Sequence, residues 1–189
     1  MSFVKTARLA VILGMALLSA RISHADEPQL PGTMVGGPPT FPYRSIVQNA
    51  QSSSDHTTLA EALKAAGLLE TLQGPGPFTV FAPTNEAFEK LPPGTVEALV
   101  RTENRAALVK MLTYHVVPGK VTAARIRSAI KAGGGAATLT TVEGEALFAI
   151  LYDDRIVLTD SKGGTATITI ANVIQSNGLI HVVDAVLIP

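Results

Sequence analysis

The feature that most constrains the fold is a series of short strand-like segments in the second half of the chain. These segments are 138–142, 146–152, 155–159 and 165–171, and turn-forming residues such as Glu-Gly, Asp-Asp and Ser-Lys-Gly-Gly separate them. In the last of these segments threonines alternate with Ala or Ile, which predicts one solvent-exposed face and one buried face. The second half therefore predicts an antiparallel meander.

The final apolar run, 179–188, differs from the other segments because it has no polar face. A strand that is apolar on both sides is buried on both sides, so we expect it at the centre of the sheet.

The first half of the domain has helical patterning around a single strand. Helices are expected at 45–50, from a cap at Asp55 or Thr57 to Gly67, at 95–100 and at 104–112, with a strand at 77–82 followed by a cap at Thr84 or Asn85. Helices first and antiparallel strands later indicate the α+β class. No internal repeat is visible, so the domain is present once.

The N-terminus has the pattern of a secretory signal. Lys5 and Arg8 flank the start of an apolar stretch, 9–20, and Ser23 and Ala25 have the small-x-small spacing that signal peptidase accepts. The apolar stretch is shorter than the roughly 20 residues that span a bilayer. We therefore predict a signal peptide over residues 1–25, an extended Pro- and Gly-rich leader over 26–43, and one domain over 44–189. The expected location is secreted, either extracellular or periplasmic, with no membrane span.

Charge and cysteine content exclude several classes of protein. The chain has 15 basic and 15 acidic residues, and removal of the signal peptide with its three basic residues leaves a net charge of −3. No basic stripe remains, so we expect no nucleic-acid partner. Cysteine is absent, which excludes disulfides and a cysteine nucleophile.

The sequence also lacks the patterns of common catalytic sites. It contains neither a Gly-x-Ser-x-Gly elbow nor a His-Glu-x-x-His helix. Three histidines remain after the signal peptide, namely His56, His115 and His181. His181 and Asp184 lie three apart on a predicted strand, so their side chains point to opposite faces and share no ligand. We expect no enzyme, no metal and no cofactor.

Three blocks of the chain resemble the signature segments of the fasciclin domain. Residues 79–88 (TVFAPTNEAF) resemble the first block, 112–117 (LTYHVV) the central Tyr-His motif, and 177–184 (NGLIHVVD) the C-terminal block, in the family's order. The resemblance implies a fasciclin-like wedge, in which several helices pack around a twisted, antiparallel-rich β-sandwich. It also implies a secreted or surface protein that serves adhesion.

Candidate binding residues follow from the same resemblance. In animal matrix members the Tyr-His motif is implicated in receptor binding, which makes Tyr114 and His115 candidates. A second adhesion motif, Asp-Ile, corresponds here to Asn172 and Val173, so its acidic residue is absent. The partner implied is a cell-surface or matrix protein, a glycan or another copy of the chain. Alternatively, Tyr114 and His115 are structural, end a helix and begin a strand, and lie partly buried and hydrogen-bonded.

Two functions stay open at this point. The first is a secreted, non-catalytic binding module for cell adhesion or extracellular-matrix contact. The second is a carrier of a small apolar ligand held between helices and sheet. A carrier needs an apolar pocket of about 300 Å3 or more, whereas an adhesion module needs an exposed apolar or aromatic patch. The oligomeric state and the identity of the partner are left open.

Overall fold

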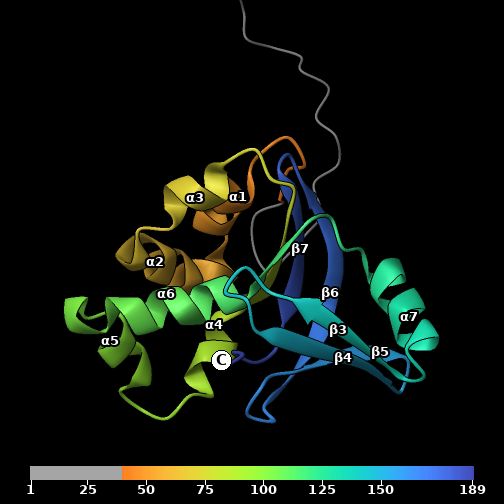
Figure 1. The fold of residues 1–189 in the computed structure, drawn as a ribbon. Coiled ribbons are helices and arrows are strands. Elements are labelled where there is room, and N and C mark those ends of the chain that lie inside the picture. The colour runs from red at the N-terminus through yellow and green to blue at the C-terminus, as the bar shows by residue number, and fades with distance from the viewer. Residues whose placement is uncertain (1–39) are drawn as a thin grey trace, which may run out of the picture.

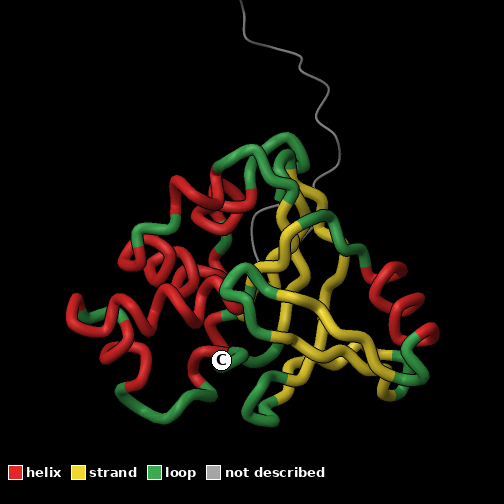
Figure 2. Tube along the Cα trace, in the orientation of Figure 1, coloured by secondary structure: helices red, strands yellow, loops and turns green. Residues whose placement is uncertain are grey.

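The computed structural model describes residues 40–189, in which helices pack on one side of a curled sheet and a further helix lies on the other side (Figure 1, Figure 2). The helices are α1 (Ile46–Ser52), α2 (Thr57–Ala66), α3 (Leu69–Gln73), α4 (Asn85–Glu89), α5 (Thr95–Leu99), α6 (Arg105–Tyr114) and α7 (Ala123–Ala132). The strands are β1 (Phe78–Pro83), β2 (Val116–Pro118), β3 (Ala136–Thr140), β4 (Ala146–Tyr152), β5 (Arg155–Thr159), β6 (Thr165–Gln175) and β7 (Gly178–Val183). The predicted signal peptide, 1–25, and most of the predicted leader, 26–43, lie outside the described residues.

The seven strands form one sheet in the order β2-β1-β7-β6-β5-β4-β3. Neighbouring strands run antiparallel except β1 and β7, which run parallel with Phe78 opposite Gly178. The sheet curls until its two edge strands approach each other. The N–H of Val142, just after β3, donates to the carbonyl of Val116 in β2 at 2.7 Å. The α+β class is confirmed, with a sheet that nearly closes into a barrel.

The last strand is central and buried, as its apolar pattern predicts. β7 lies between β1 and β6, and every one of its residues is buried. It is shorter than the predicted run 179–188, because the chain leaves the sheet at Asp184, whose carboxylate accepts a hydrogen bond from the N–H of Thr167 at 2.7 Å.

Strands β1 and β7 separate two hydrophobic cores. The helix-side core lies between the sheet and α1, α2 and α6, and its buried sheet residues are Val80, Ala82, Val116, Val173, Ile180 and Val182. The barrel core lies inside the curled sheet and under α7, and it includes Phe81, Tyr114, Ile126, Leu147, Leu158, Val183 and Leu187. Alternate residues of β1 and β7 thus enter different cores, which explains why neither strand has a polar face.

Local capping chemistry sets several helix ends. Ser45 and Gln48 form a reciprocal capping box at the start of α1, and the hydroxyl of Thr84 caps α4, one of its two predicted caps. Gly67 ends α2 in the left-handed conformation at φ 74°, as predicted. The predicted cap of α2 at Asp55 or Thr57 is wrong: a 3₁₀ turn ending at His56 leads into the helix, and no side chain caps it.

Two elements were not predicted from the sequence, namely α3 and α7, while β2 was expected only by the structural alternative, in which Tyr114 and His115 end a helix and begin a strand. The more consequential is α7, which lies just before the predicted meander, where no element was expected, and covers the barrel core with Ala123, Ile126 and Ile130. The hydroxyl of Thr122 caps its first turn. Two strands also differ in length from their predictions, since β3 begins before 138 and β6 continues past 171.

Candidate functional site

The Tyr-His motif lies where α6 ends and β2 begins. Tyr114 is the last residue of α6 and His115 is its C-cap. Both side chains lie inside the molecule, with exposed fractions of 0% and 2%. This is the arrangement that the structural alternative predicts, and burial is more complete than the partial burial expected from the sequence.

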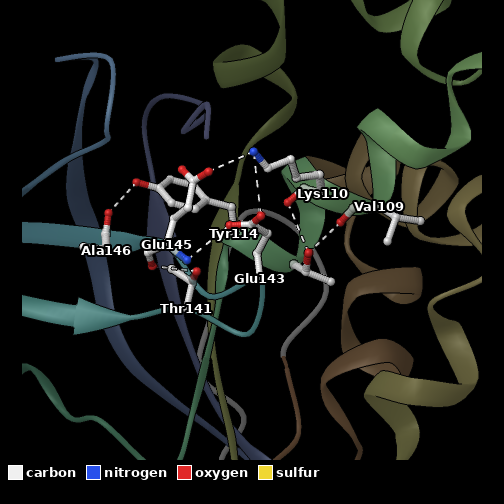
Figure 3. Close-up of polar contacts among 8 residues, drawn as sticks. Val109, Lys110, Tyr114, Thr141, Glu143, Glu145 and Ala146 are labelled. Carbon is white, nitrogen blue, oxygen red and sulfur yellow. Dashed lines mark hydrogen bonds and ion pairs between the residues drawn. The ribbon is translucent and has the colours of Figure 1, made fainter.

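The phenol of Tyr114 joins α6 to the start of β4. Its hydroxyl donates to the carbonyl of Ala146 at 2.9 Å, as Figure 3 shows. Burial raises the pKa of Tyr114, so the phenol stays protonated and acts as a donor. The motif's tyrosine therefore holds the first residue of β4 in place.

The imidazole of His115 ties α6 to the C-terminal segment. Nδ1 lies 2.8 Å from the carbonyl of Met111, to which it donates, and Nε2 accepts from the N–H of Leu187 at 3.0 Å. Burial lowers the pKa of His115 to about 4, so the ring is neutral at pH 7. A neutral ring provides one donor and one acceptor, and both are used.

Asn172 and Val173 lie at an irregularity in β6, where the register with β7 shifts. Asn172 is exposed and has a positive φ of 61°, and its Oδ1 accepts from the N–H of Ala123 at the start of α7 at 2.8 Å. Val173 is buried in the helix-side core. The two neighbours thus face opposite sides of the strand, and only Asn172 contacts solvent.

His181 completes the contacts around Asn172. Its Nδ1 accepts from the N–H of Asn172 at 3.3 Å, and its Nε2 donates to the carbonyl of Val121 at 2.9 Å. The ring stacks on Phe81 with centroids 5.5 Å apart, and burial lowers its pKa. Tyr114 and His115 therefore form a structural joint at the α6–β2 junction, Asn172 forms one between β6 and α7, and Val173 packs in the helix-side core.

A fasciclin-domain profile matches residues 54–189. The chain belongs to the fasciclin family. It is 44% identical over 179 residues to the protein sll1483 of Synechocystis sp., and the match covers 94% of this chain and 92% of that protein. Its identity to the immunogenic protein MPB70 of Mycobacterium bovis is 33% over 145 residues, covering 74% of this chain and 66% of MPB70. Human periostin is 31% identical over 146 residues, which are 77% of this chain and 16% of periostin.

A solved structure shares the fold of this fasciclin domain. It is a FAS1 domain pair from the insect cell adhesion molecule fasciclin I, with a TM-score of 0.70 and coverage of 82% of this chain and 57% of that one. The sequence identity is 17%, so the likeness shows the fold alone.

Beside the Tyr-His motif the fasciclin domain carries an ionic cluster that sequence reasoning missed. Figure 3 shows Lys110 of α6 reaching toward Glu145 and Glu143 in the β3–β4 turn, with Nζ–Oε1 distances of 2.8 and 3.7 Å. The hydrogen bond between Lys110 and Glu145 raises the pKa of Lys110 and lowers the pKa of Glu145. More than 30 residues separate the partners, so no local pattern indicates them.

The outer face of β4 is the fasciclin domain's most apolar exposed strand face among the described residues. Phe148, Ile150 and Tyr152 are 41%, 36% and 67% exposed, whereas Leu147 before them and Ala149 among them are fully buried and Leu151 is partly buried. We call these three exposed residues the β4 row. Thr138 and Thr159 flank Phe148 on the adjacent strands, and Arg155 lies opposite Tyr152.

Residues 40–189 contain no group of three or more side chains placed to hold a metal ion. Within the same range, no helix is long and apolar enough to cross a membrane.

Proposed function

We propose that this fasciclin domain is a secreted, non-catalytic binding module that contacts a cell-surface or matrix protein, or a glycan, through the β4 row. The exposure of that row carries the proposal. β4 alternates fully buried side chains with large apolar ones, although a solvated face of an antiparallel sheet is normally polar. A contiguous exposed apolar patch is typical of an interaction site.

The chemistry of the row suits recognition by contact. Phe148 and Tyr152 offer flat rings, and Arg155 opposite Tyr152 adds a planar cation. Tyr and Arg are enriched among the residues that contribute most to binding at interfaces. The threonines beside Phe148 offer hydroxyls at the rim. The patch is small, so we expect transient contact that gains strength from several domains or copies.

We propose that the Tyr-His motif acts on binding through the fold. Tyr114 and His115 are buried, as is Val173, so none of them reaches a partner in this conformation. The hydroxyl of Tyr114 nevertheless holds Ala146, the first residue of the strand that carries the β4 row. Tyr114 is thus a positioning residue, and Asn172 is the one exposed member of the four candidates.

Carriage of a small apolar ligand is the second candidate function, and the crevice in the helix-side core is too narrow to enclose a typical ligand unless the helices move apart. The apolar crevice between helices and sheet is wide enough for a water molecule over only about 20 Å3, far below the about 300 Å3 that encloses a typical ligand.

The double substitution Phe148→Thr with Tyr152→Thr tests the proposal. Beads coated with the protein should lose attachment to cells and to matrix components, while the melting temperature stays unchanged, because threonine suits an exposed strand face. Ile174→Thr is the matched control, since Ile174 is 53% exposed on β6 and lies outside the row. Tyr114→Phe, which removes only the hydroxyl, should weaken attachment partly. Equal attachment of the double variant and the Ile174 control would refute binding through the row.

A further inference from the structure

A narrow crevice opens between the first two helices and the sheet. Its walls are aliphatic, formed mainly by Ile46 of α1, Leu59 and Leu63 of α2, and Val173 and Ile180 of the sheet. The space between the atoms amounts to about 420 Å3 with its open mouth, of which about 20 Å3 is wide enough for water. The crevice is therefore a slit, too thin for a bulky molecule and lined by groups that attract little water.

One polar side chain in this slit is incompletely paired. His56 is 4% exposed, and its Nδ1 lies 2.9 Å from the hydroxyl of Ser53. Its Nε2 is buried and has no hydrogen-bond partner among the described residues. Because the serine hydroxyl can donate or accept, Nε2 is free to take the complementary role.

Asn49, another polar residue that lines the slit, is already satisfied. The amide of Asn49 accepts from the N–H of Phe41 at 3.1 Å, donates to the carbonyl of the same residue, and contacts the amide of Gln175. An unpaired buried nitrogen is unfavourable, since folding removes its hydrogen bond to water without replacing it. His56 thus stands out as a group whose partner is not supplied by residues 40–189.

Burial lowers the pKa of His56 against the opposing carboxylate of Asp55, so the ring is neutral at pH 7. Aliphatic walls and a neutral ring disfavour a charged ligand, because no counter-ion offsets its loss of hydration.

We propose that the crevice binds a thin, neutral, mostly apolar molecule that carries a single hydroxyl or carbonyl, whose oxygen pairs with Nε2 of His56. The apolar part lies between α1, α2 and the β7 face of the sheet, and binding widens the slit by moving the helices. This site is independent of the β4 row, which lies on the outer face of the barrel, so either proposal can fail without the other.

Titration with 1-hexanol followed by NMR tests the site. We expect saturable shifts confined to α1, α2, β6 and β7, together with a change in the 15N shift of Nε2 of His56 that reports the new hydrogen bond. Hexanoate, which has the same chain length and a charge, should not produce them. Shifts scattered over the surface, or equal binding of hexanoate, would overturn the proposal.

Two variants separate the polar contact from the apolar one. His56→Leu should lower the affinity for 1-hexanol about tenfold, the factor that one buried hydrogen bond supplies, without lowering the melting temperature. Ala50→Val, which fills the slit and keeps His56, should abolish binding. Unchanged affinity in His56→Leu would refute the pairing. A crystal structure grown with 1-hexanol in which Nε2 binds an ordered water instead of the hydroxyl would refute it as well.

Discussion

The two hydrophobic cores differ in how completely the histidine rings beside them are hydrogen-bonded. At the barrel core, His115 and His181 each donate from one ring nitrogen and accept at the other, all to or from backbone groups. At the helix-side core, His56 has one ring nitrogen bound to Ser53 and one without a partner among the described residues. Directional bonds allow one geometry, whereas aliphatic contacts tolerate small movements. The barrel core is therefore the fixed part of the domain and the helix-side core the adaptable part.

Adjacent residues of β7 give the sharpest test of this difference. Val183 faces the barrel core and Val182 the helix-side core, and both are buried. Val183→Asp should prevent cooperative folding, because an unpaired charge inside the barrel costs more than about 4 kcal/mol. Val182→Asp should leave a folded but less stable protein, because the helices can separate and admit water. Thermal unfolding followed by circular dichroism measures the stability of both variants. Equal losses of stability would mean that the two cores do not differ.

Acid should destabilise the domain mainly through the barrel core. The pKa of His115 is about 4 in the folded protein, against an ordinary value of 6.5 in the unfolded chain. Between these values the unfolded chain binds more protons, so stability is complete above pH 6.5 and falls as the pH drops toward 4. The loss from His115 is about 3 kcal/mol. Burial lowers the pKa of His181 and His56 as well, which acts in the same direction.

Urea unfolding between pH 7 and pH 4.5 measures this loss. His115→Gln should flatten the pH dependence strongly and His56→Leu only slightly, because the pKa of His115 is the one lowered furthest. A larger effect from His56→Leu would place the acid sensitivity in the helix-side core instead.

Asn172 allows a smaller and finer test of the joint between β6 and α7. Asn172→Ala removes the cap on Ala123 and also strains a backbone at φ 61°, so it should cost about 2 kcal/mol. Asn172→Gly removes the cap without the strain and should cost about half as much. Chemical denaturation would rank the two, and a glycine variant less stable than the alanine variant would show that φ is not the constraint.

The local sequence pattern was enough to predict much of the sheet. Strands β4 and β5 were predicted with their bounds, and the two-sided apolar pattern of β7 placed it at the centre. The helix α7 was missed although Ala123, Ile126 and Ile130 follow helical spacing after Thr122. The structural alternative anticipated a strand beginning at Tyr114 and His115, but β2 is only three residues long and its pairing with β1 depends on a distant segment.

The candidate site could be predicted less well, for a physical reason. The motif residues were found by resemblance, but their burial depends on contacts with distant segments, such as Leu187 for His115 and Ala146 for Tyr114. The role of Asn172 requires both a positive φ and a helix that begins 49 residues earlier. The β4 row was visible as part of a strand, but which of its faces meets solvent depends on how the barrel closes.

The parallel pairing of β1 with β7 has a consequence for the order of folding. It joins the first strand of the domain to the last, so the middle of the sheet stays incomplete until the final residues are available. Contacts between such distant segments form late, because the loop between them must first close. A chain that emerges N-terminus first therefore stays incompletely folded until synthesis is nearly finished, which suits the secretion that the predicted signal peptide implies. Loss of the last dozen or so residues would remove the centre of the sheet rather than an edge.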